Sequence, residues 1–165
     1  MKKQYSGGIY KISSWAHLIN AHPLPGEGII KGLKECDSEE GGSMMCKGLL
    51  LIAEMSSQGS LFTPEYSTRA IDMAVNNMDF VVGFIAGRRL ECRQDFIYFT
   101  PGIQFSNTSD SLGQKYKTPD DAIRGGSDVI IVGRGIIDSK DQIMTAKDYR
   151  RKAWESYEKR ISNKE

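Results

Sequence analysis

A glycine-flanked arginine, in the sequence Gly133-Arg134-Gly135, directly follows the apolar run VIIV at residues 129–132. Four consecutive β-branched residues without polar alternation predict a strand that is covered on both faces, as in a parallel sheet. The glycines allow unusual backbone angles and let a ligand approach the main chain, while Arg134 supplies a forked cation that matches a phosphate. A phosphate site and an ordinary turn with a solvated arginine are both consistent with this segment alone.

Polar, glycine-rich segments also follow other apolar runs, at residues 21–28 (AHPLPGEG), 54–60 (EMSSQGS) and 100–116 (TPGIQFSNTSDSLGQKY). The last is long and has no periodicity, and such loops in compact domains are commonly lids or binding loops, with a merely flexible connection as the alternative. Active residues of parallel α/β proteins lie in the loops after the strands. These segments are therefore the candidate site.

Five apolar runs supply the strands that would position these loops, within residues 15–22, 48–55, 80–87, 95–102 and 128–135. Thr63-Pro64 and Thr118-Pro119 each predict the start of a helix, and Gly125-Gly126 predicts the end of the second one. A last helix is predicted from Thr145, with an apolar stripe that consists of Tyr149, Ala153, Trp154, Tyr157 and Ile161.

Repeated strand, loop and helix units with right-handed crossovers form either an open doubly wound sheet or a (β/α) barrel. An eight-unit barrel needs about 250 residues, so five units cannot close one. We expect residues 1–165 to form a single α/β domain, which is either a complete open sheet or the C-terminal five βα units of a TIM (β/α)8 barrel without its N-terminal units.

The composition and charge of the chain limit the classes of function that it can have. The chain has 165 residues, of which 39% are apolar and 26% charged, as in ordinary globular proteins. Its net charge of +1 creates no overall field for nucleic acid or an anionic membrane, so any anion site must be local. No apolar run reaches the roughly 20 residues of a membrane span, and the start lacks a signal-peptide segment. Cys36, Cys46 and Cys92 show no metal-ligand spacing and predict reduced thiols in a cytoplasmic protein.

Several motifs together resemble a known family. They are LLLIAEMSSQGSL, FVVGFIAG, TPGIQF, LGQKY and GSDVIIVGRGII, in this order between residues 49 and 137. They resemble the C-terminal part of orotidine 5′-phosphate decarboxylases, including the decarboxylase domain of eukaryotic uridine monophosphate synthases. The likeness runs from about Lys2 to Ile161. It implies a (β/α)8 barrel, active as a homodimer, that converts orotidine monophosphate to uridine monophosphate with no metal and no organic cofactor.

The resemblance also assigns substrate-binding roles. The 5′-phosphate would be held by Gly133 and Arg134, with Gln114 and Tyr116 closing over it. Ser56 would read the pyrimidine amide edge, for which a hydroxyl has both a donor and an acceptor, and Pro101 would border the base. Bidentate arginine is strong and directional toward phosphate. Without the resemblance, a helix-cap or turn role for the serine is the alternative.

The family's catalytic Asp-x-Lys-x-x-Asp motif is absent from this chain. Asp138-Ser139-Lys140 is the nearest match, but Ile143 stands where the second aspartate is needed, and the segment lies in another loop. We therefore expect no catalytic residue in this chain, which would begin just downstream of the catalytic segment. His22 is a weak substitute acid, because no partner carboxylate lies near it in sequence.

Three functions remain open. The first is a decarboxylase fragment that keeps the phosphate and pyrimidine contacts with orotidine or uridine monophosphate. The second is another phosphate-binding barrel, such as a ribulose-phosphate epimerase, against which the LGQKY and AEMSSQGS segments argue. The third is a non-catalytic nucleotide-binding or assembly module. We expect a homodimer, or association with a chain that supplies the missing strands, and no nucleic acid or membrane partner.

Overall fold

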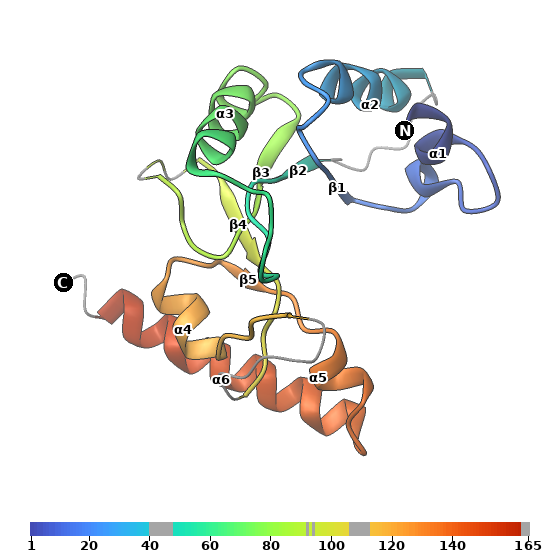
Figure 1. Cartoon of the computed structure of the whole chain (residues 1–165). Coiled ribbons are helices and arrows are strands. Elements are labelled where there is room, and N and C mark those ends of the chain that lie inside the picture. Colours follow the sequence, from blue (N-terminus) through green and yellow to red (C-terminus); the bar gives the residue numbers. More distant parts are fainter. Residues whose placement is uncertain (40–47, 92, 94, 106–112, 163–165) are drawn as a thin grey trace. The chain divides into compact units, whose positions relative to one another are not determined.

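The structure is a computed structural model that describes residues 1–39, 48–91, 93, 95–105 and 113–162. Its elements follow one another as α1 (Lys2–Ser6), η1 (Ile12–Ser14), β1 (Leu18–Ala21), α2 (Gly28–Glu39), β2 (Gly48–Ile52), α3 (Pro64–Val75), β3 (Val81–Ile85), β4 (Ile97–Thr100), α4 (Pro119–Arg124), β5 (Val129–Ile130), α5 (Arg134–Ile137) and α6 (Gln142–Ser162) (Figure 1). The strands form a five-stranded sheet in chain order, β1-β2-β3-β4-β5. β1 pairs parallel with β2, and β4 with β5.

All five predicted strands are confirmed, but the expected full burial at residues 129–132 is wrong. Only Val129 and Ile130 form a strand, and Val129 and Ile131 are each 39% exposed. The reason is position, because β5 is the last strand of the sheet and has a neighbour on one side only. The runs that are buried along almost their whole length are β2 and β3.

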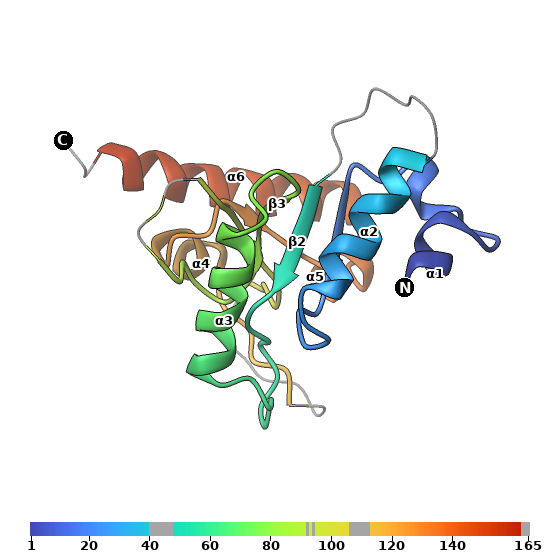
Figure 2. The ribbon, with the colours of Figure 1, turned by 90° about the horizontal axis from the view of Figure 1, so that it is seen from above.

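The chain divides into two compact units, and the first contains residues Met1–Ala53 and Thr63–Phe84. Its core includes Leu49 and Leu51 of β2 and Ala74 of α3, all fully buried. α3 packs against β2, as the view from above shows (Figure 2). Gly48 begins β2 where a Cβ atom would lie 2.7 Å from a methyl group of Val82, so a larger residue would force β2 away from β3.

The second unit contains residues Glu54–Phe62 and Ile85–Glu165. α4 packs on α6, and a buried cluster of Ile103, Ala122 and Tyr149 lies at its centre. Phe105 stacks on Tyr149 with ring centroids 3.9 Å apart. The start of the long loop after β4 is thereby attached to the last helix.

The predicted helix starts are confirmed. The Thr63 side chain accepts from the Tyr66 amide at α3, and Thr118 forms a capping box with Asp121 at α4. The predicted start of the last helix was wrong. α6 begins at Gln142 rather than Thr145, because the Asp141 carboxylate accepts from the Met144 amide at 2.9 Å and caps an extra turn.

The apolar stripe of α6 is only partly buried. Tyr149 is 3% exposed, whereas Trp154 is 60% and Ile161 46% exposed. The indole Nε1 of Trp154 donates to Glu158 on the same helix rather than into a core. Periodicity predicted the stripe but not how much of it this chain can cover.

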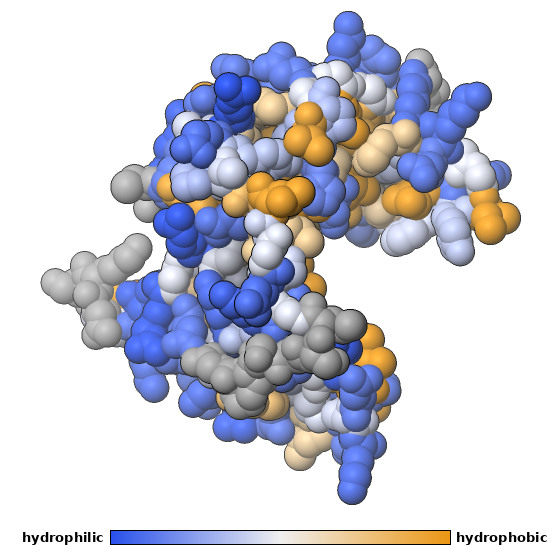
Figure 3. Space-filling view, viewed as in Figure 1, coloured by the Kyte–Doolittle hydropathy of each residue, from blue (hydrophilic) through white to orange (hydrophobic). Residues whose placement is uncertain are grey.

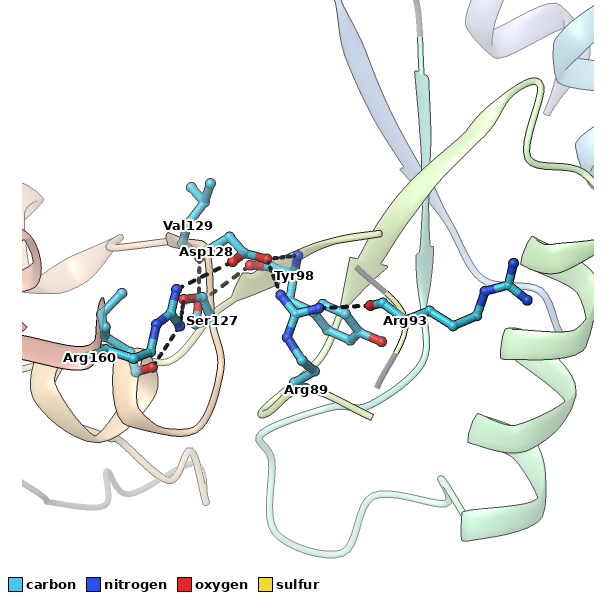
Figure 4. A network of polar contacts seen from close by, with 8 residues as sticks. Arg89, Arg93, Tyr98, Ser127, Asp128, Val129 and Arg160 are labelled. Atoms are coloured by element: carbon cyan, nitrogen blue, oxygen red, sulfur yellow. Dashed lines mark hydrogen bonds and ion pairs between the residues drawn. The ribbon is translucent and has the colours of Figure 1, made fainter. Parts of the chain in front are cut away.

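A polar network around Asp128 joins the segments before β4 and β5 to α6 (Figure 4). Asp128 Oδ2 accepts from the Tyr98 amide at 2.9 Å and from Arg89 at 2.8 Å, and Oδ1 lies 3.6 Å from Arg160. Arg160 also donates to the carbonyls of Ile123 and Ser127, each at 2.9 Å. Because these groups are partly shielded from water and bonded in several directions, the network stabilises unit 2 more than a single surface ion pair would.

Within the described ranges, no helix is long and apolar enough to cross a bilayer. The same part of the chain holds no group of three or more His, Cys, Asp or Glu side chains arranged for a metal ion. Cys36 is a buried free thiol, while Cys46 and Cys92 lie outside the described residues.

Candidate functional site

All the predicted substrate-binding residues belong to unit 2. The segment after β2 pairs antiparallel with the end of the long loop after β4, through a bridge between Ser57 and Gln114. The Gln58 amide donates to the Gly113 carbonyl at 2.8 Å, and the Lys115 amide donates to the Ser56 carbonyl at 3.2 Å. This pairing brings together two segments that are far apart in sequence.

The pairing places Ser56 beside Gln114. The Gln114 side-chain amide donates to the Ser56 hydroxyl, and it also donates to the Lys115 carbonyl at 3.1 Å. Both side chains are half-buried. A hydroxyl and a carboxamide held together in this way offer an ordered set of donors and acceptors to a planar amide.

Gly102 makes this contact possible. Its φ is +72°, in the left-handed region, and a Cβ atom would lie 2.6 Å from Gln114 Nε2 and 3.0 Å from Ser56 Oγ. Pro101, predicted to border a base, precedes it and is half-buried. Gly102 was not among the residues predicted from the sequence, although a Pro-Gly pair is typical of a turn that needs this backbone geometry.

Arg134 lies against Tyr116. The guanidinium carbon is 5.6 Å from the centroid of the Tyr116 ring, within cation–π range. Two residues from separate loops, both predicted to contact phosphate, are thus neighbours. The Arg134 side chain is exposed, and its guanidinium has the forked geometry that matches a phosphate.

The two glycines beside Arg134 differ in the space that is available for a larger side chain. Gly133 caps α5 with a φ of −100°, and a Cβ atom there would meet no described atom within 4 Å. A Cβ atom at Gly135 would lie 2.5 Å from the Tyr149 hydroxyl, so packing excludes a larger residue there. Burial raises the pKa of Tyr149, partly offset by a backbone hydrogen bond from Phe105, so this phenol stays neutral near pH 7.

A second polar cluster contains residues that the sequence analysis missed. Glu54 Oε2 accepts from the Gly87 amide at 3.0 Å, and Oε1 pairs with Arg88 at 3.4 Å. Lys117 Nζ donates to the Gly87 carbonyl at 2.7 Å. These residues follow three different strands and share no local motif, so only the fold brings them together.

Two predictions stand apart from this site. His22 follows β1 and belongs to unit 1, and the expectation that it is not a catalytic acid stays a prediction. Residues 106–112 of the predicted lid lie outside the described residues.

Comparison with known proteins shows the family of this chain. A sequence model of the Orotidine 5′-phosphate decarboxylase / HUMPS family matches residues 1–149. The chain belongs to this family. It is 48% identical to the uridine 5′-monophosphate synthase of Bos taurus and 47% identical to the orotidine 5′-phosphate decarboxylase of Schizosaccharomyces pombe, with 98% of the chain covered in each case.

The relatives are longer than this chain. It spans 33% of the Bos taurus synthase and 61% of the Schizosaccharomyces pombe decarboxylase. Among solved structures, it superposes on the orotidine 5′-phosphate decarboxylase of Lactobacillus acidophilus with a TM-score of 0.65 at 22% identity, covering 86% of this chain and 65% of that one. The orotidine 5′-monophosphate decarboxylase of Sulfolobus solfataricus gives the same TM-score at 19% identity, covering 90% of this chain and 66% of that one. The fold is therefore that of consecutive βα units of a (β/α)8 barrel.

Proposed function

We propose that this chain is part of an orotidine 5′-phosphate decarboxylase, which converts orotidine monophosphate to uridine monophosphate and carbon dioxide, the last step of de novo pyrimidine synthesis. One observation carries the proposal. In a single unit, three loops form a Ser56–Gln114 pair and a Tyr116–Arg134 pair from segments that match the family. The first pair suits a pyrimidine amide, and the second suits a phosphate.

In this proposal each residue has a defined role. Ser56 hydrogen-bonds the amide edge of the pyrimidine, and Pro101 borders the ring. Arg134 and the open main chain at Gly133 hold the 5′-phosphate, over which Gln114 and Tyr116 close. Because the phosphate is remote from the reacting carbon, its binding energy can hold the loops closed during the reaction.

The chemical step needs groups that these 165 residues do not contain. Loss of the carboxylate leaves a carbanion at the ring carbon, which requires a positioned ammonium group to stabilise and protonate it. The family supplies it from the Asp-x-Lys-x-x-Asp segment, without a metal or organic cofactor. The contribution of this chain is therefore to bind and orient the nucleotide.

Calorimetric titration of the chain with uridine monophosphate tests the binding role. We expect uridine, which lacks the phosphate, to bind at least about tenfold more weakly, because charge-assisted hydrogen bonds to the phosphate are lost. Equal affinities for the two ligands would show that Arg134 and Tyr116 do not form a phosphate site. Binding that is followed by no decarboxylation even when a family segment with the Asp-x-Lys-x-x-Asp motif is supplied would favour the alternative, a non-catalytic nucleotide-binding module.

We also propose that the chain associates with a second copy of itself. An apolar groove of about 710 Å³ in unit 2 is lined by side chains of β5, α5 and α6, including Ile130, Ile136 and Trp154. It adjoins the edge strand β5, and apolar side chains reach the surface near α5 (Figure 3). Such a patch beside an open sheet edge favours association. A partner chain that supplies further βα units would occupy the same groove.

Sedimentation velocity at micromolar concentration tests the association. We expect a dimer with a largely apolar contact above about 1,000 Å². Trp154→Lys should shift the protein to monomer, whereas Leu61→Lys, which changes another exposed apolar residue outside the groove, should not. A native chain that remains a monomer at these concentrations would contradict the proposal.

A cytoplasmic location is proposed from the cysteines, which the sequence predicts to be reduced, and from the metabolic role. Fractionation of cells that express the tagged protein would check it, and recovery with the membrane or secreted fraction would contradict it.

A further inference from the structure

Lys117 directly follows Tyr116 and occupies a junction between three strand ends. Its amide donates to the Gly102 carbonyl and its carbonyl accepts from the Gln104 amide, each at 2.9 Å. Its backbone thus fixes the end of the long loop against the segment that follows β4. Its side chain turns to the loop after β3, where Nζ donates to the Gly87 carbonyl at 2.7 Å.

Gly87 is bonded on both sides. While its carbonyl accepts from Lys117, its amide donates to Glu54 Oε2 at 3.0 Å. A Cβ atom at Gly87 would lie 3.3 Å from both the Glu54 carboxylate and the Lys117 ammonium. The glycine therefore lies between two opposite charges: its amide donates to the carboxylate, and its carbonyl accepts from the ammonium group.

The two outer residues of this cluster flank the proposed site. Glu54 precedes Ser56 by two residues, and Lys117 immediately follows Tyr116. The cluster consequently adds a further connection between the Ser56 loop and the Tyr116 loop, beside their backbone pairing and the Ser56–Gln114 hydrogen bond. Together these connections restrain the orientation of Tyr116, against which Arg134 lies.

We propose that Lys117 is a positioning residue for the nucleotide site. Its ammonium group binds the Gly87 carbonyl rather than the ligand, and it holds the Tyr116 ring where that ring supports the Arg134 guanidinium. Holding an exposed lysine side chain in one place costs conformational entropy, and the hydrogen bond to the Gly87 carbonyl offsets this cost. The contact therefore stabilises one loop geometry. The inference rests on the proposed function, because it assigns Lys117 to the same site.

Lys117→Met tests the inference, since it keeps an unbranched side chain that is one atom shorter and removes the donor. The matched control is Lys115→Met, which removes the same charge two residues away, from a side chain with no hydrogen bond or ion pair among the described residues. Lys117→Arg restores a cationic donor. Thermal unfolding of each variant should show that the unit remains folded.

The first measurement is amide hydrogen exchange of the ligand-free proteins. We expect faster exchange at residues 113–117 in Lys117→Met than in the native chain, because the loop end has lost one of its attachments. Lys115→Met should exchange like the native chain, and Lys117→Arg should recover most of the protection. Unchanged exchange in Lys117→Met would overturn the inference, whether or not the chain binds nucleotide.

The second measurement is the affinity for uridine monophosphate. Lys117→Met should weaken it about tenfold, and this loss should shrink in an Arg134→Ala background, because the lysine acts through Tyr116 and Arg134. An equal loss in both backgrounds would contradict a positioning role. If the native chain binds no uridine monophosphate, the proposed function fails, and with it the assignment of Lys117 to a nucleotide site, while exchange still decides whether Lys117 holds the loop.

Discussion

Arg134→Ala should weaken the binding of uridine monophosphate by about 2 kcal/mol or more, which is roughly thirtyfold. The guanidinium is exposed beside Tyr116, at the start of a short helix whose preceding glycine leaves the main chain open. A forked cation in this place can form two parallel hydrogen bonds to a phosphate, which alanine cannot. Calorimetry with uridine monophosphate measures the loss directly.

Two further variants make the result specific. Arg134→Lys keeps the positive charge but loses the fork, so we expect an affinity between those of the native and alanine proteins. Arg151→Ala removes an exposed arginine that pairs with Asp148 and Glu155 on α6, and it should leave the affinity unchanged. The phosphate role of Arg134 would be wrong if Arg134→Ala and Arg151→Ala bound the nucleotide equally well.

The 165-residue chain by itself should not decarboxylate orotidine monophosphate at an enzymatic rate. Positioned charges that stabilise a developing carbanion account for several kcal/mol of barrier lowering, and a phosphate site cannot replace them. We therefore expect a rate lower by at least three orders of magnitude than that of a family member with the Asp-x-Lys-x-x-Asp segment. A spectrophotometric assay of orotidine monophosphate consumption gives the rate.

The assay requires protein from a host that lacks its own decarboxylase, because a trace of a proficient enzyme would dominate the signal. The Schizosaccharomyces pombe relative, measured at the same concentration, supplies the reference rate. Turnover by the verified chain within tenfold of that reference would show that other residues, such as Lys117 or His22, carry the chemistry.

The sequence predicted the parts of this fold that depend on local chemistry. Apolar runs revealed the strands, and Thr63 and Thr118 revealed helix starts because their caps involve residues three positions away. The exposure of Val129 and Trp154 was not predictable in the same way. Burial depends on whether a neighbouring element covers the residue, and no local pattern records that.

In the candidate site, too, local sequence predicted the residues but not their long-range contacts. The motifs marked Ser56, Gln114, Tyr116 and Arg134, but the pairing of Ser56 with Gln114 arises from an antiparallel bridge between distant segments. The contact of Lys117 could not be predicted from the sequence, because its partner is a backbone carbonyl and every residue has one. Contacts of a side chain with a remote main-chain atom are visible only in the folded structure.

Gly102 limits how this site can change over evolutionary time. Any other residue there would enter the space shared by Gln114 and Ser56, and it would also be forced into a left-handed backbone conformation. A single mutation at position 102 therefore cannot be neutral while both partners remain, and a lineage could leave glycine only by rebuilding the loop after β4 together with the loop after β2. Positions 56, 102 and 114 should therefore change together in evolution. A homologue with a residue other than glycine at position 102 should have different structures in both loops.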